Sequence, residues 1–287
     1  MASDTVALTA TVADLGPDLD DWCAYHLRHF GRIILWLDHH EHLDSRLLPR
    51  HPGILALPGD QTASSSRHTN FMRRQNANAD AAIKLCFEAG IPWLVHLDQD
   101  EILYGLKESL WDSDAGQITF PNHEVCPVWE ASTLFHGPRY FRLSGRSDFR
   151  LYTNGKSAVR CGPDVRSLGA HCFTGFAGQT ITVEHPQVLH YACATYASWL
   201  HKYRRLGTFE SCWYDDPAVP ITLRFHLDSR DACRSQDPHA ARAFFARYVL
   251  PQSKLVKLEA EGIVMRADPF GETPAAAVER REPADGL

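Results

Sequence analysis

The stretch PWLVHLDQDEIL, residues 92–103, decides the fold class, because an apolar run ends there in three acidic residues within four positions. The segment 93–98 is short and mainly apolar, which is typical of a strand that is covered on both faces. Asp98, Asp100 and Glu101 fall at the carboxyl end of this run. The pattern predicts a buried strand that ends in a negatively charged rim.

Strand-like and helix-like segments alternate before this stretch. The segments expected to form strands are residues 5–13, 32–38 and 53–59. Acidic residues open the segment 16–31 and Gly31 is placed to end it, which predicts a helix, and residues 70–89 are good helix formers. The order β-α-β-β-α-β predicts an α/β fold with a mainly parallel sheet and helices on its faces.

The second half of the chain is less regular. The segments expected to form strands there are residues 116–121, 140–153 and 179–191. Thr195 is a candidate N-cap for a helix over residues 195–207, and Asp237 with Pro238 would open another helix over residues 237–250.

The length of 287 residues suits one large domain or two small ones, and we expect a single domain over residues 1–266. Residues 267–287 are rich in Pro, Ala and charge without any period, so we expect them to form a disordered tail.

Composition limits the classes of function. The net charge of −6 disfavours nucleic acid as a partner, and no apolar run approaches the roughly 20 residues that cross a bilayer. The N-terminus has no basic residue ahead of its apolar part, which argues against a secretory signal. The eight Cys residues form no CxxC pair, so we expect isolated thiols in the cytoplasm, while a lumenal protein with disulfides stays open.

The carboxylates at the strand end require a counter-charge. Ligands of open parallel sheets bind beyond the carboxyl ends of the strands, where Asp98, Asp100 and Glu101 fall. Carboxylates this close repel one another, and Mg²⁺ or Mn²⁺ would offset them while keeping positions open for phosphate oxygens. A solvated acidic loop is the alternative, but the preceding strand favours a binding site.

Four segments of the chain resemble glycosyltransferases of the GT-A fold. WLVHLDQDEIL resembles their DxD segment in the form with an added Glu, as in family 2 and family 92 type enzymes, and DDWCAYHLRHFGRIILWLDHH resembles their early segment. Residues 152–173 resemble the Gly-Lys-Ser segment that precedes a His, and residues 188–207 resemble the late His-Tyr helix. The resemblance covers about residues 5–207 and implies a Rossmann-like GT-A fold. Gln99 stands where an aliphatic residue is commoner.

This resemblance implies a metal-dependent, inverting glycosyltransferase of the hexosyltransferase class. The donor would be a nucleoside-diphosphate sugar, with a UDP-sugar favoured, and the acceptor a glycan or another hydroxyl compound. The nucleotide-sugar half is expected within about residues 1–115, and the acceptor and diphosphate half within about residues 116–266. A bound Mn²⁺ or Mg²⁺ and basic side chains would stabilise the charge on the leaving diphosphate.

The resemblance also implies the metal ligands. Asp100 is expected to bind the metal directly, Asp98 to bind the metal or the donor, and His171 to be the third ligand. Glu101 is expected to support these ligands or to be structural. A His between small residues, as His171 is, is also commonly structural.

Four other residues complete the implied site. Asp38, at the end of the second strand, is expected to contact the nucleoside, Lys156 to reach the diphosphate, and His190 to line the donor or acceptor site. The simpler interpretations are a turn residue for Asp38, a hairpin tip for Lys156 and a packed strand end for His190. Because inversion needs a carboxylate that takes the acceptor proton, Glu124 is the candidate general base. Open alternatives for that role are Asp148, Asp164 and Asp216.

Other classes of protein stay open. A phosphohydrolase of the haloacid dehalogenase type also carries DxD after a strand, but its motif has Thr or Val where this chain has Ile102. A metal-free glycoside hydrolase needs two carboxylates across a sugar. A non-catalytic carbohydrate-binding protein would not need the strand-end carboxylates.

Overall fold

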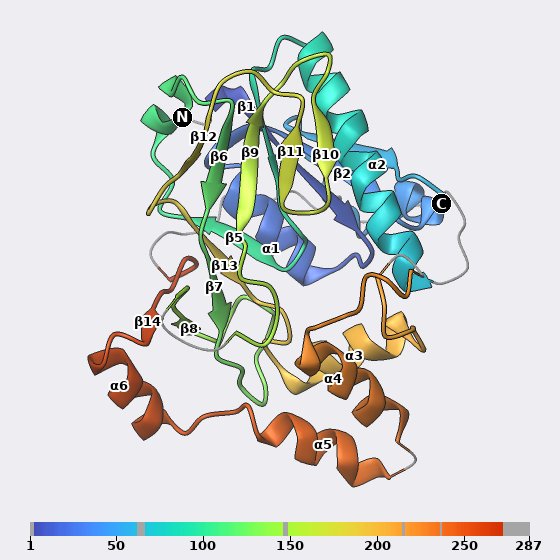
Figure 1. The fold of residues 1–287 in the computed structure, drawn as a ribbon, viewed down its shortest axis with the longest axis vertical. Helices are drawn as coiled ribbons and strands as arrows, with labels where there is room; N and C mark the ends of the chain where they lie inside the picture. Colours follow the sequence, from blue (N-terminus) through green and yellow to red (C-terminus); the bar gives the residue numbers. More distant parts are fainter. Residues whose placement is uncertain (1–2, 62–66, 146–148, 214–215, 236, 272–287) are drawn as a thin grey trace, which may run out of the picture.

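The computed structural model describes residues 3–61, 67–145, 149–213, 216–235 and 237–271. Its main sheet is built around four strands that run parallel to one another (Figure 1). They are β1 (Ser3–Val12), β2 (Phe30–Leu37), β3 (Ile54–Pro58) and β4 (Trp93–His96). Together with the helices α1 (Pro17–His26) and α2 (Arg67–Glu88), they confirm the predicted β-α-β-β-α-β order.

Three shorter strands complete this sheet. They are β6 (Gln117–Phe120), β9 (Lys156–Arg160) and β12 (Thr180–Thr182). The full order is β12-β6-β9-β4-β1-β2-β3, in which β9 runs antiparallel to both of its neighbours and the other pairs are parallel. The predicted fold class, an α/β fold with a mainly parallel sheet and flanking helices, is therefore confirmed.

Alternate residues of β1 face opposite sides of the sheet, as the period of a strand requires. Val6 and Leu8 pack with Trp22 of α1 in one core, whereas Ala7 packs with Ile83 of α2 in the other. The sheet is thus covered by α1 on one face and by α2 on the other, which explains why its central strands are apolar almost throughout. The carboxyl ends of β1, β2 and β4 share one edge of the sheet.

A second sheet, which the sequence does not predict, continues from the acidic stretch. Its strands are β5 (Glu101–Tyr104), β7 (Asn122–Val125), β8 (Tyr140–Arg142), β13 (Gln187–His190) and β14 (Val264–Arg266). Their order is β14-β8-β7-β13-β5. The smaller elements are the hairpin β10 (Arg166–Leu168) and β11 (Cys172–Thr174), with the 3₁₀ turns η1 (His40–Asp44) and η2 (Glu108–Asp112). Because β4 ends and β5 begins within residues 92–103, this stretch joins the two sheets.

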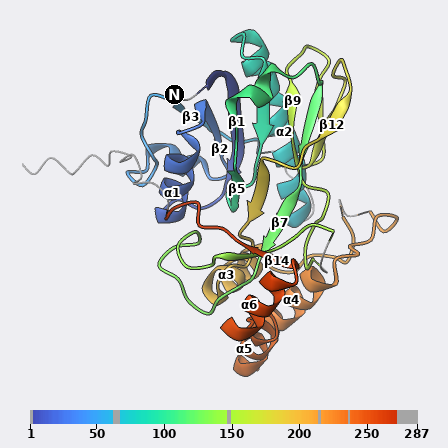
Figure 2. The ribbon, with the colours of Figure 1, turned by 90° about the vertical axis from the view of Figure 1, so that its left-hand side faces the viewer.

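Four helices gather at one end of the molecule, below both sheets (Figures 1 and 2). They are α3 (Tyr196–Leu206), α4 (Arg224–Arg234), α5 (Pro238–Ala246) and α6 (Gln252–Ala260). The first three enclose an aromatic core in which Trp199 stacks on Phe244 at 5.5 Å between ring centroids. The predicted N-caps are confirmed, since Thr195 accepts from the Ser198 amide and Asp237 from the His239 amide. No helix among the described residues is long and apolar enough to cross a bilayer.

Two predicted boundaries in the first half and the tail need correction. The helix predicted over residues 16–31 ends at His26, and Gly31 lies inside β2, because Phe30 already pairs with β1. In the predicted tail, Ala267 and Phe270 pack on the core, and Phe270 stacks on Phe135 at 5.4 Å. Residues 272–287 lie outside the described part.

Three predicted elements in the second half are also wrong in extent. The strand predicted over residues 140–153 stops at Arg142, because the chain turns at Gly145 with a φ of 71°. The strand predicted over residues 179–191 splits into β12 and β13, since Pro186 has no N–H for a ladder. The helix predicted over residues 237–250 ends at Ala246, and α4 and α6 were not predicted.

Candidate functional site

The acidic motif forms the turn between β4 and β5 at the carboxyl edge of the main sheet. The side chains of Asp98 and Asp100 remain 26 % and 22 % exposed, whereas that of Glu101 is fully buried. Two of the three carboxylates are therefore accessible from solvent and the third belongs to the core.

Lys156 supplies the first counter-charge to this cluster. Its Nζ lies 2.8 Å from Oδ2 of Asp98 and 3.4 Å from Oε2 of Glu101, and its side chain is fully buried. Burial alone would lower the pKa of Lys156 and raise that of Asp98, but their attraction outweighs burial and keeps both groups charged. Gly155 directly precedes β9 and must be glycine there, because its φ is 70° and a Cβ would collide with the carbonyl oxygen of Phe120.

Glu101 is an anchor inside the cluster. The Asp98 amide donates to its Oε2 at 2.7 Å, and the Tyr152 hydroxyl donates to its Oε1. Burial raises the pKa of Glu101 to about 8, although Lys156 opposes the shift. The place of Glu101 suits the structural alternative that the sequence left open.

Asp100 has a different cation, which comes from α3. Lys202 Nζ donates to Oδ2 of Asp100 at 3.1 Å, and Nε2 of His190 lies 3.7 Å from Oδ1. Burial would raise the pKa of Asp100, but Lys202 lowers it below its usual value. Burial also lowers the pKa of His190 to about 4, so this imidazole is neutral near pH 7, and its Nδ1 has no partner among the described residues.

His171 reaches the same neighbourhood from the turn between β10 and β11. Its Nδ1 donates to the carbonyl of Gly155 at 2.8 Å, which leaves Nε2 as the atom with a free lone pair. The Tyr152 ring contacts the rings of both His171 and His190, with centroid distances of 4.4 and 4.8 Å. Burial lowers the pKa of His171 to about 4.

The predicted metal ligands are thus neighbours, but they do not form a ready ligand set. Among the described residues, no group of three or more His, Cys, Asp or Glu side chains is arranged to hold a metal. Asp98 and Asp100 each pair with a lysine instead. The donor types nevertheless suit a divalent metal, because carboxylate oxygens and an imidazole with its other nitrogen tied to a carbonyl are common ligands.

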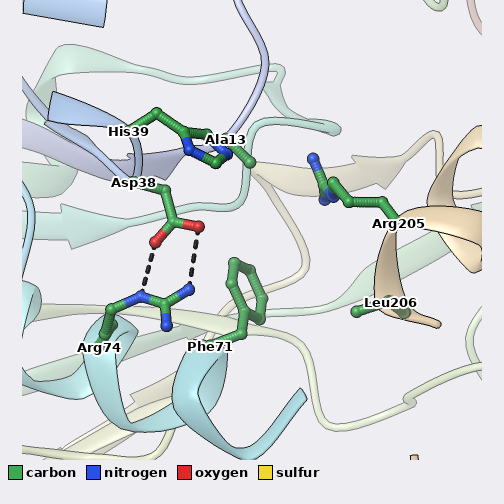
Figure 3. A pocket seen from close by; sticks show the side chains of 7 residues that line it. All are labelled: Ala13, Asp38, His39, Phe71, Arg74, Arg205 and Leu206. Atoms are coloured by element: carbon green, nitrogen blue, oxygen red, sulfur yellow. Dashed lines mark hydrogen bonds and ion pairs between the residues drawn. The ribbon is translucent and has the colours of Figure 1, made fainter. Parts of the chain in front are cut away.

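A small pocket, open to solvent, lies beside this rim, where β2 ends (Figure 3). Arg74 of α2 donates from Nε and Nη2 to the two oxygens of Asp38, at 2.6 and 2.9 Å. Phe71 lies next to this pair, and Arg205 of α3 points in from the opposite side (Figure 3). The other lining residues are Ala13, His39 and Leu206. Asp38 therefore lines a pocket, where it already carries a bidentate partner, and its contact with a nucleoside stays a prediction.

Two helices connect the pocket with the acidic rim. On α2, Arg74 holds Asp38 and its neighbour Gln75 donates to Oδ1 of Asp98 at 2.7 Å. On α3, Arg205 lines the pocket and Lys202 holds Asp100. The pocket and the rim are therefore parts of one site.

Sequence reasoning missed five polar residues of this site. They are Arg74, Gln75, Tyr152, Lys202 and Arg205. None belongs to a short motif, and the only signal was the excess of basic residues in the late helix, HKYRR, at residues 201–205.

Glu124, the candidate general base, lies away from open solvent in β7. Its side chain is fully buried and pairs with Arg150, whose amide donates to Oε2 at 2.8 Å, while the Leu151 amide donates at 3.0 Å. These contacts tie down the loop at residues 150–151, so the structure gives Glu124 a structural task, and its catalytic role stays a prediction. Asp164 and Asp216 are exposed in loops. Asp148 lies outside the described residues.

No protein-family model matches the chain. Its sequence is similar to two proteins at low identity. "Glycosyltransferase-like At2g41451" of Arabidopsis thaliana is 27% identical over 165 residues, which cover 47% of this chain and 37% of that protein. "Glycosyltransferase-like At3g57200" of the same plant is 26% identical, with 47% and 32% covered. The chain spans about a third of the length of the curated relatives it matches.

Two solved structures are remotely similar. Mannose-1-phosphate geranyltransferase from Thermus thermophilus covers 85% of this chain and 68% of its own, at 10% identity and a TM-score of 0.29. 4-Diphosphocytidyl-2C-methyl-D-erythritolsynthase from Anaerococcus prevotii covers 72% and 79%, at 10% identity and a TM-score of 0.27. Scores this low do not establish a shared fold. What the comparisons support is a likeness, over about half of the chain, to proteins named glycosyltransferase-like.

Proposed function

We propose that this protein is a glycosyltransferase that uses a nucleoside-diphosphate sugar, with a GT-A-like domain over residues 1–266. One observation carries the proposal. A partly exposed pair of carboxylates, Asp98 and Asp100, adjoins the Asp38 pocket at the carboxyl edge of a parallel sheet. This edge is where α/β sheets of this kind bind their ligands.

The charges of the site suit a diphosphate. Lys202 and Arg205 lie three residues apart on α3, so they share one helix face, between the rim and the pocket. A nucleoside in the pocket would place its diphosphate beside this face. Phe71 offers an aromatic surface for the base, and UDP is the donor nucleotide that we favour.

We further propose that Mn²⁺ or Mg²⁺ binds at Asp98 and Asp100, with His171 as a third ligand. Such an ion would neutralise charge on the leaving diphosphate. Lys202 donates to Oδ2 of Asp100, so Oδ1 of this carboxylate is the atom that we expect to bind the ion. Lys156 is fully buried and remains a support of Asp98 rather than a direct diphosphate ligand.

The acceptor chemistry is also part of the proposal. We expect transfer of a hexose to the hydroxyl of a glycan or a similar compound, with inversion at the sugar carbon. Glu124 could take the acceptor proton only if Arg150 released it, because Arg150 and its loop occupy both carboxylate oxygens. The eight Cys residues form no CxxC pair in the sequence, which suits a reducing compartment such as the cytoplasm.

Thermal unfolding with nucleotides and metal tests the proposal. We expect UDP, GDP or dTDP sugars together with Mn²⁺ to raise the midpoint by more than the sum of the separate effects, because bound ligand stabilises the native state. Asp100→Ala should abolish this synergy. Asp231→Ala, at a 60 % exposed carboxylate on α4, is the matched control and should keep it.

Two outcomes would contradict the proposal. One is the absence of any shift with every nucleotide and metal pair, and the other is an unchanged synergy in Asp100→Ala. Release of free phosphate without an acceptor would instead favour the phosphohydrolase. Sugar binding that survives Asp100→Ala and needs no nucleotide would favour a carbohydrate-binding protein.

A further inference from the structure

Gln99, the middle residue of the acidic motif, is directed away from the charged cluster. Its Nε2 donates to the carbonyl oxygen of Asp14 at 2.5 Å. Its Oε1 accepts from the amides of Ala13 at 3.3 Å and of Asp14 at 3.5 Å. One carboxamide therefore forms hydrogen bonds with both amide groups and a carbonyl group of the segment that follows β1.

These bonds take the place of a strand ladder. The pairing of β1 with β4 covers residues 6–9 and 93–96, and the last main-chain bond joins the Leu97 amide to the Thr9 carbonyl at 3.1 Å. Beyond that point Gln99 continues the contact with its side chain. An aliphatic residue there would leave the amides and carbonyl of residues 13 and 14 to compete for water.

The segment that Gln99 holds, residues 13 and 14, belongs to the pocket of Asp38 rather than to the acidic rim. Ala13 lines the pocket of Asp38, and the carbonyl of Val12, just before it, accepts from the Asp38 amide at 2.8 Å. The carboxylate of Asp14 pairs with Arg205 of α3 and lies 3.3 Å from Nε2 of His201. Gln99 thus fastens the acidic turn to the wall of the pocket and, through Asp14, to α3.

We propose that Gln99 is a positioning residue that couples the nucleoside pocket to the acidic rim. The inference rests on the proposed function, since it assigns the two ends of one donor to the two parts. Fixing their spacing lets a nucleoside diphosphate contact both at once, without a further cost for ordering the segment between them.

Binding of a whole donor nucleotide and of its two ends, measured by calorimetry with Mn²⁺ present, tests the inference. The probes are UDP, uridine and pyrophosphate. We expect Gln99→Leu to weaken UDP about tenfold, the equivalent of about one lost hydrogen bond. The affinity of Gln99→Leu for uridine and for pyrophosphate should each stay within about twofold of that of the unmodified protein, because either end alone does not need the fixed spacing.

Two further variants make the test specific. Gln99→Asn keeps the carboxamide but shortens its reach, so it should weaken UDP binding as Gln99→Leu does. If Gln99→Leu does not fold, Gln99→Asn takes its place in the test. Gln252→Leu is the matched control, because Gln252 is an exposed glutamine of α6 that donates to the Tyr140 hydroxyl at 3.0 Å. It should bind all three probes normally.

The outcomes separate this inference from the function on which it rests. If the unmodified protein binds no UDP, the proposed function fails and the inference with it. If it binds UDP and Gln99→Leu binds UDP equally well, the inference alone is overturned. It is also overturned if Gln99→Leu weakens all three probes by the same factor, since that is the result of a merely structural role.

Discussion

Replacing Lys156 by Met is expected to destabilise the protein far more than the loss of an exposed lysine would. The side chain is fully buried between Asp98 and Glu101, whose oxygens lie 2.8 and 3.4 Å from its Nζ. Removing the cation leaves the Asp98 carboxylate without its main counter-charge and the buried Glu101 without this polar neighbour. Removing one partner of a buried ion pair costs about 3–5 kcal/mol.

This cost translates into a measurable shift in the unfolding temperature. With 287 residues and an unfolding entropy of about 2.1 cal/mol/K per residue, the protein loses about 0.6 kcal/mol of stability per kelvin near its midpoint. The variant should therefore unfold about 5–8 °C below the unmodified protein at neutral pH. Urea denaturation followed by tryptophan fluorescence measures the same loss as a free energy.

The loss should also depend on pH. Without Lys156, the pKa values of Asp98 and Glu101 in the folded state rise, and that of Glu101 already lies at about 8. A group whose pKa is raised by folding contributes stability below its unfolded pKa and loses it as the pH rises through the folded value. The variant should consequently be closer in stability to the unmodified protein at pH 5 than at pH 8.

Lys202→Met is the matched control, because its ammonium also pairs with a motif carboxylate but its side chain is 31 % exposed. Solvent screens that pair, so we expect a loss of about 1 kcal/mol or less. A loss below about 1 kcal/mol for Lys156→Met, or one that does not grow between pH 5 and pH 8, would refute the assignment of Lys156 as the support of the acidic cluster.

Three further predictions concern the core. Arg150→Met should cost about 3–5 kcal/mol in urea denaturation, because it leaves the buried Glu124 unpaired, and a loss under about 1 kcal/mol would contradict this. Trp199→Ala should cost a similar amount through the cavity it leaves, and unchanged unfolding would count against the aromatic core. Burial lowers the pKa of His26 to about 3, so the stability of the protein should fall as the pH drops below 6.5. The fall should be less steep in His26→Gln, and equal slopes of stability against pH in calorimetry would refute the assignment of His26 as a buried neutral imidazole.

The sequence predicted the elements whose periodicity is local. The helix at residues 70–89 and the strands around β1, β2 and β4 show their burial in the spacing of apolar residues, so these elements and their order were predictable. The acidic rim was predictable for the same reason, since it directly follows a strand. The second sheet was not predictable, although β8 and β13 lie within predicted strands, because segments of three or four residues carry too little pattern and their pairing joins distant parts of the chain.

What the sequence determined by itself is an α/β fold with carboxylates at the rim of its sheet. Only the tertiary structure decided what neutralises and connects them. Lys156 meets Asp98 across 58 residues, and Lys202 meets Asp100 across 102. Hydrophobic spacing encodes which face of an element is buried, whereas charge partners this far apart in the chain become neighbours only through the packing of sheets and helices.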